Sequence, residues 1–292
     1  MLQNQIVSIK GVSRTHVVRP TPDQIQELAD RYDLHDLIVE DVEDARVQDK
    51  IDMYDDHTFI VLHFPKYDTV KKRYFGNEFN IIMGKDYIVS FTSYETSHIA
   101  AIRHEFNEDI ERMEKSEKFK ASPYFVLYTM IDVMYDKMMS ALIKFQRDLG
   151  ILEDGIFGDK GLQTSLLEEL LIKRRNSTML KHMLFPQKEI LTELHTMTEK
   201  LYGGELDVYF EDLEYKLDKV LGMIAIVNET TVSLSETYGS LASVQTNQVV
   251  SVLTIYTVVI GLMTLITGFY GMNVALPGQG NHSVVRLIII VM

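Results

Sequence analysis

The C-terminal part of the chain is almost free of charge, and this feature constrains the fold more than any other. All 42 acidic residues lie at or before Glu236, and Arg286 is the single formally charged side chain in residues 237–292. Within this part, residues 249–270 are uncharged and mostly apolar. About 20 such residues span the hydrocarbon core of a bilayer as a helix. The sequence therefore predicts a membrane-spanning helix over 249–270.

A long helical pattern leads directly into this segment. Proline is absent from residues 187–276, and the single glycines at 222 and 239 are tolerated inside a helix. One continuous helix over 206–269 would be roughly 95 Å long at about 1.5 Å per residue. Side chains at intervals of three or four define one face of it: Leu206, Phe210, Leu213, Leu217, Leu221, Ile224, Asn228, Thr231, Leu234, Tyr238 and Leu241. This pattern predicts a stalk helix that continues into the membrane.

One face of the predicted membrane helix is polar or small. It carries Asn247, Ser251, Thr254, Thr257, Gly261, Thr264 and Gly268, again three or four residues apart. Such a stripe favours close packing of helices, because small residues let backbones approach. It equally suits a wall that faces water. A pore lined by one helix per subunit would need a ring of subunits.

The N-terminal region, 1–105, has the alternation of an α/β domain. Residues 1–20 read as a pair of strands, and Thr21 followed by Pro22 predicts the start of a helix. A second short helix is expected over Leu34–Glu43, with Leu37 and Val39 as its apolar points. Two strands should flank the turn at Asp55-Asp56, and the second of them should end at Pro65. A hairpin turn is expected at residues 84–86.

Residues 106–204 are predicted to form a hairpin of long antiparallel helices. The first should cover 123–148, with a break from Gly150 to Gly161. The second should run from about Leu162 to Lys200, with a kink at Pro186. The fold class is therefore α+β: an N-terminal domain (1–105), a helical hairpin (106–204), and the stalk with its membrane helix (205–270).

Composition excludes several classes of function. The net charge of -13 argues against a nucleic-acid partner, since phosphate contacts need clustered Lys and Arg. The chain has no cysteine, and no phosphate-binding glycine loop or nucleophile motif is present, so an enzyme is not expected. The first residues lack the apolar stretch of a signal peptide, which predicts a large cytosolic N-terminal domain.

The membrane helix is followed by Gly271-Met272-Asn273. Gly271 could adopt a left-handed helix cap. In a ring of subunits, Asn273 amides could hold the water shell of a hydrated cation. Mg²⁺ gives up its water reluctantly, so it suits such contact.

This context of Gly-Met-Asn resembles the CorA family of magnesium transporters. The resemblance also covers PTPDQIQELADRYDLHDLIVEDVEDARVQDKIDMYDDHTFIVLHFP, YFEDLEYKL at 209–217 and the membrane helix. It implies a CorA-like funnel: a homopentamer in the cell membrane, multi-pass in the complete protein. It implies Gly271, Met272 and Asn273 as the selectivity filter, in an external loop at 271–283. It further implies the pore-lining residues Asn247, Leu253, Thr254, Thr257, Gly261 and Thr264.

The same resemblance implies that Asp212 binds regulatory Mg²⁺ between subunits. The partner carboxylate stays unassigned, because the expected loop, Tyr67–Gly76, is basic in this chain. The family also places a bulky hydrophobic residue where Gly261 stands, so one hydrophobic gate is expected to be wider.

Two departures from the family leave alternatives open. The external loop VALPGQGNHS has no acidic residue, which makes Co²⁺, Ni²⁺ or Zn²⁺ transport, with or without proton coupling, an alternative to Mg²⁺. Residues 284–292 are too few to span a membrane and are expected to be the start of a truncated second helix. A non-conducting, membrane-tethered scaffold is the alternative from another class.

Overall fold

The computed structural model describes residues 7–44, 48–108, 122–158, 162–202, 206–272, 283 and 286. The chain divides into two compact units, Met1–Ser235 and Glu236–Met292. The boundary between the units falls inside one long helix, so each unit is described by itself. The boundaries predicted above for smaller domains stay predictions.

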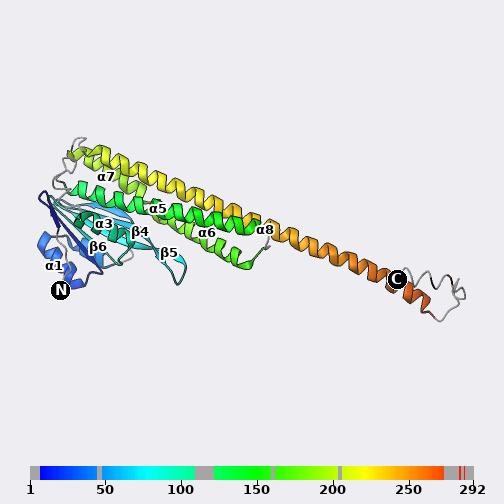
Figure 1. Cartoon of the computed structure of the whole chain (residues 1–292). Helices are drawn as coiled ribbons and strands as arrows, with labels where there is room; N and C mark the ends of the chain where they lie inside the picture. The colour runs from blue at the N-terminus through cyan, green and yellow to red at the C-terminus, as the bar shows by residue number, and fades with distance from the viewer. Residues whose placement is uncertain are drawn as a thin grey trace. The chain divides into compact units, whose positions relative to one another are not determined.

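The first unit contains a mixed six-stranded sheet (Figure 1). Its spatial order is β1-β2-β6-β5-β4-β3, and β2 and β6 are its one parallel pair among the described strands. The strands are β1 (Val7–Ile9), β2 (Val12–Val18), β3 (Lys50–Met53), β4 (Thr58–Asp68), β5 (Arg73–Met83) and β6 (Tyr87–Thr92). The predicted strand pair at the N-terminus and the hairpin around residues 84–86 are confirmed.

Strand β4 does not end at Pro65, as the sequence predicted. It continues to Asp68, and Pro65 is paired with Gly76 of β5. Strand β3 pairs with β4 only as far as Val61, so Pro65 lies where β4 has an open edge. Proline is tolerated at such an edge because its missing N–H breaks no ladder bond there. The expected loop at 67–76 is therefore the end of a long hairpin.

Both faces of the sheet are covered. One face carries α1 (Pro22–Tyr32) and α2 (Asp36–Glu43), with Phe59 and Val61 of β4 among its buried residues. Ile60 and Leu62, the alternate residues of β4, point to the other core with the long helices. This alternation follows from the two-residue period of a strand.

Helix α1 starts as the sequence predicts. The Thr21 side chain accepts from the Gln24 N–H, and the Gln24 side chain accepts from the Thr21 N–H, which completes a capping box. Helix α2 presents only part of the predicted face, because Val39 is partly buried against this core but Leu37 is not. Ile38 and Val42 are buried, whereas Leu37 is 53% exposed. The helix is short, and its rotation is set by the sheet rather than by its own pattern.

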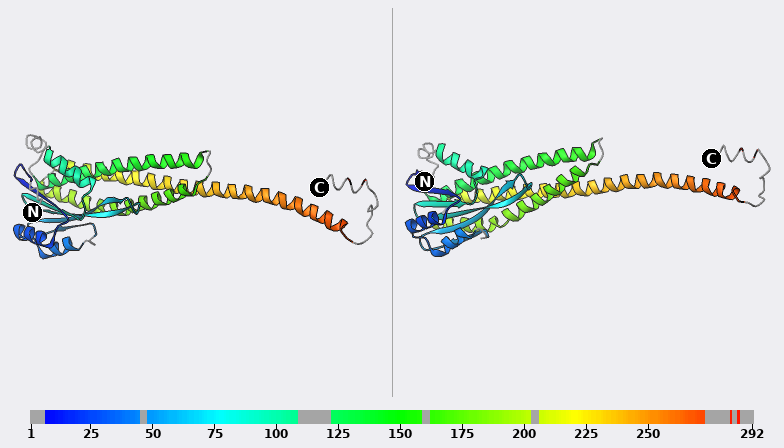
Figure 2. Two further views of the ribbon diagram at one scale, coloured as in Figure 1. Left: turned by 60° about the horizontal axis from the view of Figure 1, so that its bottom comes forward. Right: turned by 90° about the horizontal axis from the view of Figure 1, so that it is seen from below.

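The second core is formed by long helices that run side by side (Figure 2). They are α3 (Ser97–Glu108), α5 (Pro123–Phe157), α6 (Thr164–Leu184), α7 (Gln187–Tyr202) and the first part of α8 (Asp207–Tyr270). The expected interruption at Pro186 is confirmed, because it separates α6 from α7.

Helix α5 continues past Gly150, where a break was predicted. Leu149, Leu152 and Ile156 are buried in this last part. That packing outweighs the cost of about 1 kcal/mol for each glycine in a helix. Close packing explains why a glycine stands at position 155, because a Cβ there would lie 3.0 Å from Leu166 Cδ2 at the start of α6.

The second unit contains the C-terminal half of α8. As predicted, the helix continues without interruption to Tyr270. It is the one described helix that is long and apolar enough to cross a membrane. None of the most apolar stretch of this helix is buried against other described residues. Residues 284–292, apart from Arg286, lie outside the described residues.

Candidate ion pathway

The threonines of the stripe bond to their own helix. Thr254 Oγ1 donates to Val250 O, Thr257 Oγ1 to Leu253 O, and Thr264 Oγ1 to Ile260 O, each at 2.8 Å. A hydroxyl that returns its proton to the preceding turn keeps its lone pairs facing outward. The three threonines of the predicted stripe therefore form a row of acceptors whose own protons are already bonded within the helix.

Both the stripe and the apolar faces around it are uncovered in the single chain. Leu253 and Leu265 are 63% and 70% exposed. Large exposed apolar surfaces mark contact with a membrane or with other protein chains. Because the helix has polar and apolar faces, lipid alone does not match its whole surface.

The glycines of the stripe pack against no other part of the chain that the structure describes. A Cβ built on Gly261 or Gly268 would meet no described atom within 4 Å beyond the backbone of its own helix. The absence of a side chain at these positions is thus unexplained by the chain's own contacts. Close contact with another copy, or an open passage, would each explain it.

Helix α8 ends differently from the predicted left-handed cap. Among the described glycines, Gly11 is the one with positive φ, so Gly271 is not left-handed. Gly271 N–H instead donates to Thr267 O at 2.9 Å, and a Cβ on Gly271 would lie 2.9 Å from that same oxygen. The position therefore favours glycine for its size. Met272 is described and exposed, and Asn273 lies outside the described residues.

Asp212 lies on α8 in the first unit and faces α5. The Tyr128 hydroxyl donates to Asp212 Oδ2 at 3.4 Å. Burial raises the pKa of Tyr128, and the charges of Asp132 and Asp212 raise it further, so this hydroxyl keeps its proton. Asp212 is partly exposed, and among the described residues it accepts no other hydrogen bond.

A lysine beside Asp212 was missed by the sequence reasoning. Lys216, one turn further along α8, pairs with Asp132 and, at 3.2 Å, with Asp136 of α5. Burial raises the pKa of Asp132, as do Asp136 and Asp212, although Lys216 opposes the shift. Four-residue spacing on both helices was the available signal, because it places these side chains on facing stripes.

The basic tip of the β4–β5 hairpin, residues 67–76, offers one acidic residue, Asp68. Its Oδ1 accepts the N–H groups of Val70 and Lys71 at 2.9 and 3.0 Å. The hydrogen bond from Lys71 is the main reason that the pKa of Asp68 is lowered. Asp68 thus has a structural role in the turn, and the partner of Asp212 stays unassigned.

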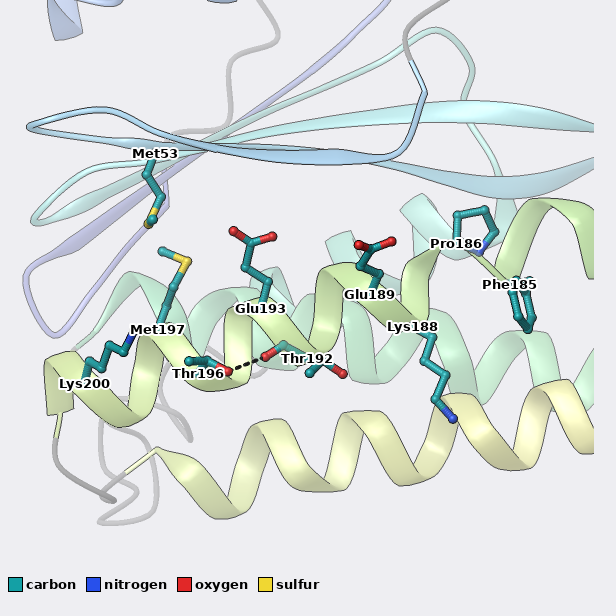
Figure 3. Close-up of a pocket in the computed structure, with 10 residues that line it drawn as sticks. All are labelled: Met53, Phe185, Pro186, Lys188, Glu189, Thr192, Glu193, Thr196, Met197 and Lys200. Atoms are coloured by element: carbon teal, nitrogen blue, oxygen red, sulfur yellow. Dashed lines mark hydrogen bonds between the residues drawn. The ribbon is translucent and has the colours of Figure 1, made fainter.

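Among the described residues, no group of three or more His, Asp or Glu is placed to hold a metal ion. The pocket between β3 and α7 also includes none of the predicted site residues (Figure 3). Its walls include Met53 on one side and Glu189 and Glu193 on the other. A metal site that involves Asp212 would therefore need further ligands from outside the described residues of a single chain.

Comparisons with known proteins agree with the predicted resemblance. Residues 11–292 match the family described as CorA-like Mg²⁺ transporter protein. The chain belongs to this family. It is 24% identical over 269 residues to the cobalt/magnesium transport protein CorA of Thermotoga maritima, which covers 91% of this chain and 72% of that protein.

Solved structures show the same fold. The complete CorA magnesium transporter of Methanocaldococcus jannaschii has a TM-score of 0.81 at 18% identity, covering 96% of this chain and 87% of that one. The ZntB cytoplasmic domain of Vibrio parahaemolyticus has a TM-score of 0.64 at 12% identity. The match covers 82% of this chain and 91% of that domain. The predicted CorA fold class is thereby confirmed. The family consists of divalent cation transporters and not of enzymes, and the chain is one of these transporters.

Proposed function

We propose that this CorA-family protein is a Mg²⁺ channel of the cell membrane, formed by five copies of the chain. The observation that carries the proposal is the polar stripe on a helix apolar enough to span a membrane. Its threonine hydroxyls are satisfied by their own helix, so the acceptor row is available to water and ions. A ring of such helices would place Asn247, Thr254, Thr257, Gly261 and Thr264 along one passage, with Leu253 at its edge.

The external end of the passage is proposed to select the ion. Gly271, Met272 and Asn273 would form the filter, with the Asn273 amides bound to the water shell of Mg²⁺ rather than to the bare ion. Neutral amides favour hydrated ions without holding them too tightly to leave. The negative potential inside the cell would then drive entry.

The cytosolic end is proposed to sense Mg²⁺ through Asp212. Its carboxylate is lightly held, by one hydrogen bond from Tyr128. Metal bound between Asp212 and an acidic group of a neighbouring copy would stabilise the closed state. When cytosolic Mg²⁺ falls, repulsion between the acidic groups would shift the population toward the open state.

The test of conduction is Mg²⁺ influx into liposomes that contain the protein. Wild type and Asn273→Ala would be compared, with Asn281→Ala as a control for loss of an amide elsewhere in the same loop. We expect influx in wild type and the control, and at least a tenfold loss in Asn273→Ala. Unchanged influx in Asn273→Ala would refute the proposed filter.

A second candidate function differs in the ion. The loop after the filter is uncharged, so it attracts Mg²⁺ less than an acidic loop would, and a Co²⁺, Ni²⁺ or Zn²⁺ transporter follows from that observation. Relatives are named cobalt/magnesium transport proteins, which supports Mg²⁺ and Co²⁺ first. Influx of each metal with and without a pH gradient separates the candidates. No flux of any metal would favour a non-conducting scaffold.

A further inference from the structure

Two buried carboxylates, one on β5 and one directly before β3, share one histidine. His63 on β4 and Glu78 on β5 are direct partners in the antiparallel register, with His63 Nε2 3.7 Å from Glu78 Oε2. On its other side, His63 Nδ1 lies 2.5 Å from Asp49 Oδ1. The side chains of Asp49 and Glu78 are only 4% and 6% exposed. These three residues are called the buried triad below.

Each carboxylate of the buried triad keeps one oxygen without a hydrogen-bond donor. Glu78 Oε1 accepts from Asn80 Nδ2 at 2.6 Å, but Glu78 Oε2 and Asp49 Oδ2 have no hydrogen-bond partner in the part of the chain that the structure describes. A buried carboxylate in that state is costly, and a cation beside it, such as a protonated His63, offsets its charge. Because Nδ1 and Nε2 of His63 each face one of the two acids, a proton on His63 is the ligand that fits.

The buried triad is joined to the helices through the backbone of its histidine. Gln187 Nε2 donates to His63 O at 2.6 Å, and the Tyr135 hydroxyl donates to Gln187 Oε1 at 2.9 Å. Gln187 begins α7, Tyr135 lies in α5, and both side chains are buried. A change in the position of His63 is therefore felt directly where the sheet packs on α5 and α7.

Burial and neighbouring charges together shift the pKa values of the triad. Burial is the main cause of the raised pKa of Asp49 and of Glu78, and Asp44 and Asp41 near α2 add to that of Glu78. Burial lowers the pKa of His63, but the hydrogen bond and charge of Asp49, with the charge of Glu78, outweigh it and raise the pKa.

Other titratable groups also face the triad. His182 of α6 lines the adjoining pocket of about 550 Å³ together with Asp49 and His63. From α5, Tyr135 faces Asp49, and burial keeps its hydroxyl protonated. Because the pocket borders Asp49 and His63, it provides these groups with a route for protons.

We propose that the buried triad is a proton-binding site that tightens the packing of the sheet on α5 and α7 as the pH falls. With His63 charged, the imidazolium separates and neutralises the two acids. When His63 loses its proton, two buried carboxylates remain without a cation between them. Their repulsion loosens β4, β5 and the Gln187 contact.

The direction of the pH dependence follows from the raised pKa values. A group with a raised pKa binds its proton more tightly in the folded than in the unfolded state. The stability contributed by His63 is therefore complete below pH 6.5 and is lost as the pH rises through its raised pKa. The stability contributed by protons on Asp49 and Glu78 is lost at lower pH than that of His63. This loss begins as the pH rises above the ordinary pKa of a carboxyl group.

Hydrogen exchange of the full chain in detergent micelles, at pH 6, 7 and 8, tests the proposal. After correction for intrinsic exchange, we expect protection of β4, β5 and the first turn of α7 to fall with rising pH, by about tenfold for each unit by which the pKa of His63 is raised. The fall should vanish in His63→Gln. In Glu78→Gln, which keeps the size of the side chain, it should move to lower pH.

The control is His195→Gln. The pKa of His195 is also raised, by Asp207 and Glu214 against the opposing effect of burial, but this histidine lies near the surface on α7. Its removal should leave the response of β4 and β5 intact. Equal pH responses in wild type and Glu78→Gln would overturn the proposal, whether or not His63→Gln folds. No ion flux is measured, so the result is independent of the proposed channel.

Discussion

The Tyr128 hydroxyl on α5 reaches across to Asp212 Oδ2 on α8, at a distance of 3.4 Å. This long hydrogen bond connects the proposed Mg²⁺ sensor to a helix that packs on the sheet. It holds the carboxylate in place without neutralising its charge. Asp212 is therefore positioned to respond to a divalent cation, which the first prediction tests.

Asp212→Asn should remove the effect of Mg²⁺ on the closed state. With a neutral amide at this position, repulsion between copies disappears and a bound cation has less to neutralise. Proteolysis of the protein in detergent, in EDTA and in excess Mg²⁺, measures the effect as metal-dependent protection. Glu211→Gln removes a neighbouring exposed acid and should keep the wild-type response. Equal protection of wild type in both conditions would contradict the regulatory role.

Gly261→Leu should block the pathway without harming the fold of the single chain. Beyond its own helix backbone, a Cβ at this position meets no atom of the described residues within 4 Å, and leucine favours a helix more than glycine does. In a ring, however, five leucines would narrow the passage. We expect at least a tenfold loss of metal influx into liposomes. Val259→Leu, off the stripe, is the matched control, and equal flux in Gly261→Leu would place the stripe away from the pore.

His98 should make the first unit sensitive to acid. Burial, with a smaller effect from Lys137, lowers its pKa to about 4, and neither ring nitrogen has a hydrogen-bond partner among the described residues. A lowered pKa means that the contribution of His98 is present above pH 6.5 and is lost as the pH falls toward 4. The difference is about 3 kcal/mol in the free energy of unfolding.

His98→Leu should therefore flatten the decline in stability between pH 6.5 and 4.5. Thermal unfolding of the full chain in detergent measures this, with His57→Leu for comparison, because burial also lowers the pKa of His57. An unchanged decline in His98→Leu would show that other groups cause it.

Local signals in the sequence were sufficient for part of the fold. The capping box of Thr21 and Gln24 involves neighbours three residues apart, so it could be predicted. Pro65 and Gly150 were misjudged because their outcome depends on packing partners. An open edge of β4 accommodates the proline, and buried leucines of α5 outweigh the glycine. Sequence alone shows the preference of a residue but not the neighbours that override it.

The candidate site divides in the same way. The stripe was predictable because its residues share one helix and a fixed spacing. The contact of Asp49 with His63 joins segments 14 residues apart, and that of Lys216 with Asp132 joins segments 84 residues apart. Only the sheet register and the packing of α5 on α8 bring them together, and no spacing in the sequence encodes that.

Lys216→Met should destabilise the α5–α8 contact more at neutral pH than in acid. Asp132 and Asp136 would lose the ammonium that they share, at an expected cost of roughly 1–3 kcal/mol for the poorly exposed Asp132. The pKa of Asp132 is already raised, mainly by burial, and would rise further in the variant. As the pH falls, protonated Asp132 no longer needs the lysine, so the stability difference should shrink.

Chemical unfolding of the full chain in detergent at pH 7 and pH 5 measures this difference. Lys188→Met is the matched control, because Lys188 pairs with Asp218 at 2.8 Å on the surface, where both side chains are more than half exposed. Its loss should cost much less than the loss of Lys216, since water screens an exposed pair. Equal costs for the two variants would mean that Lys216 makes an ordinary surface ion pair. A larger cost that declines in acid would show that α5 and α8 are held together by a partly buried charge next to Asp212.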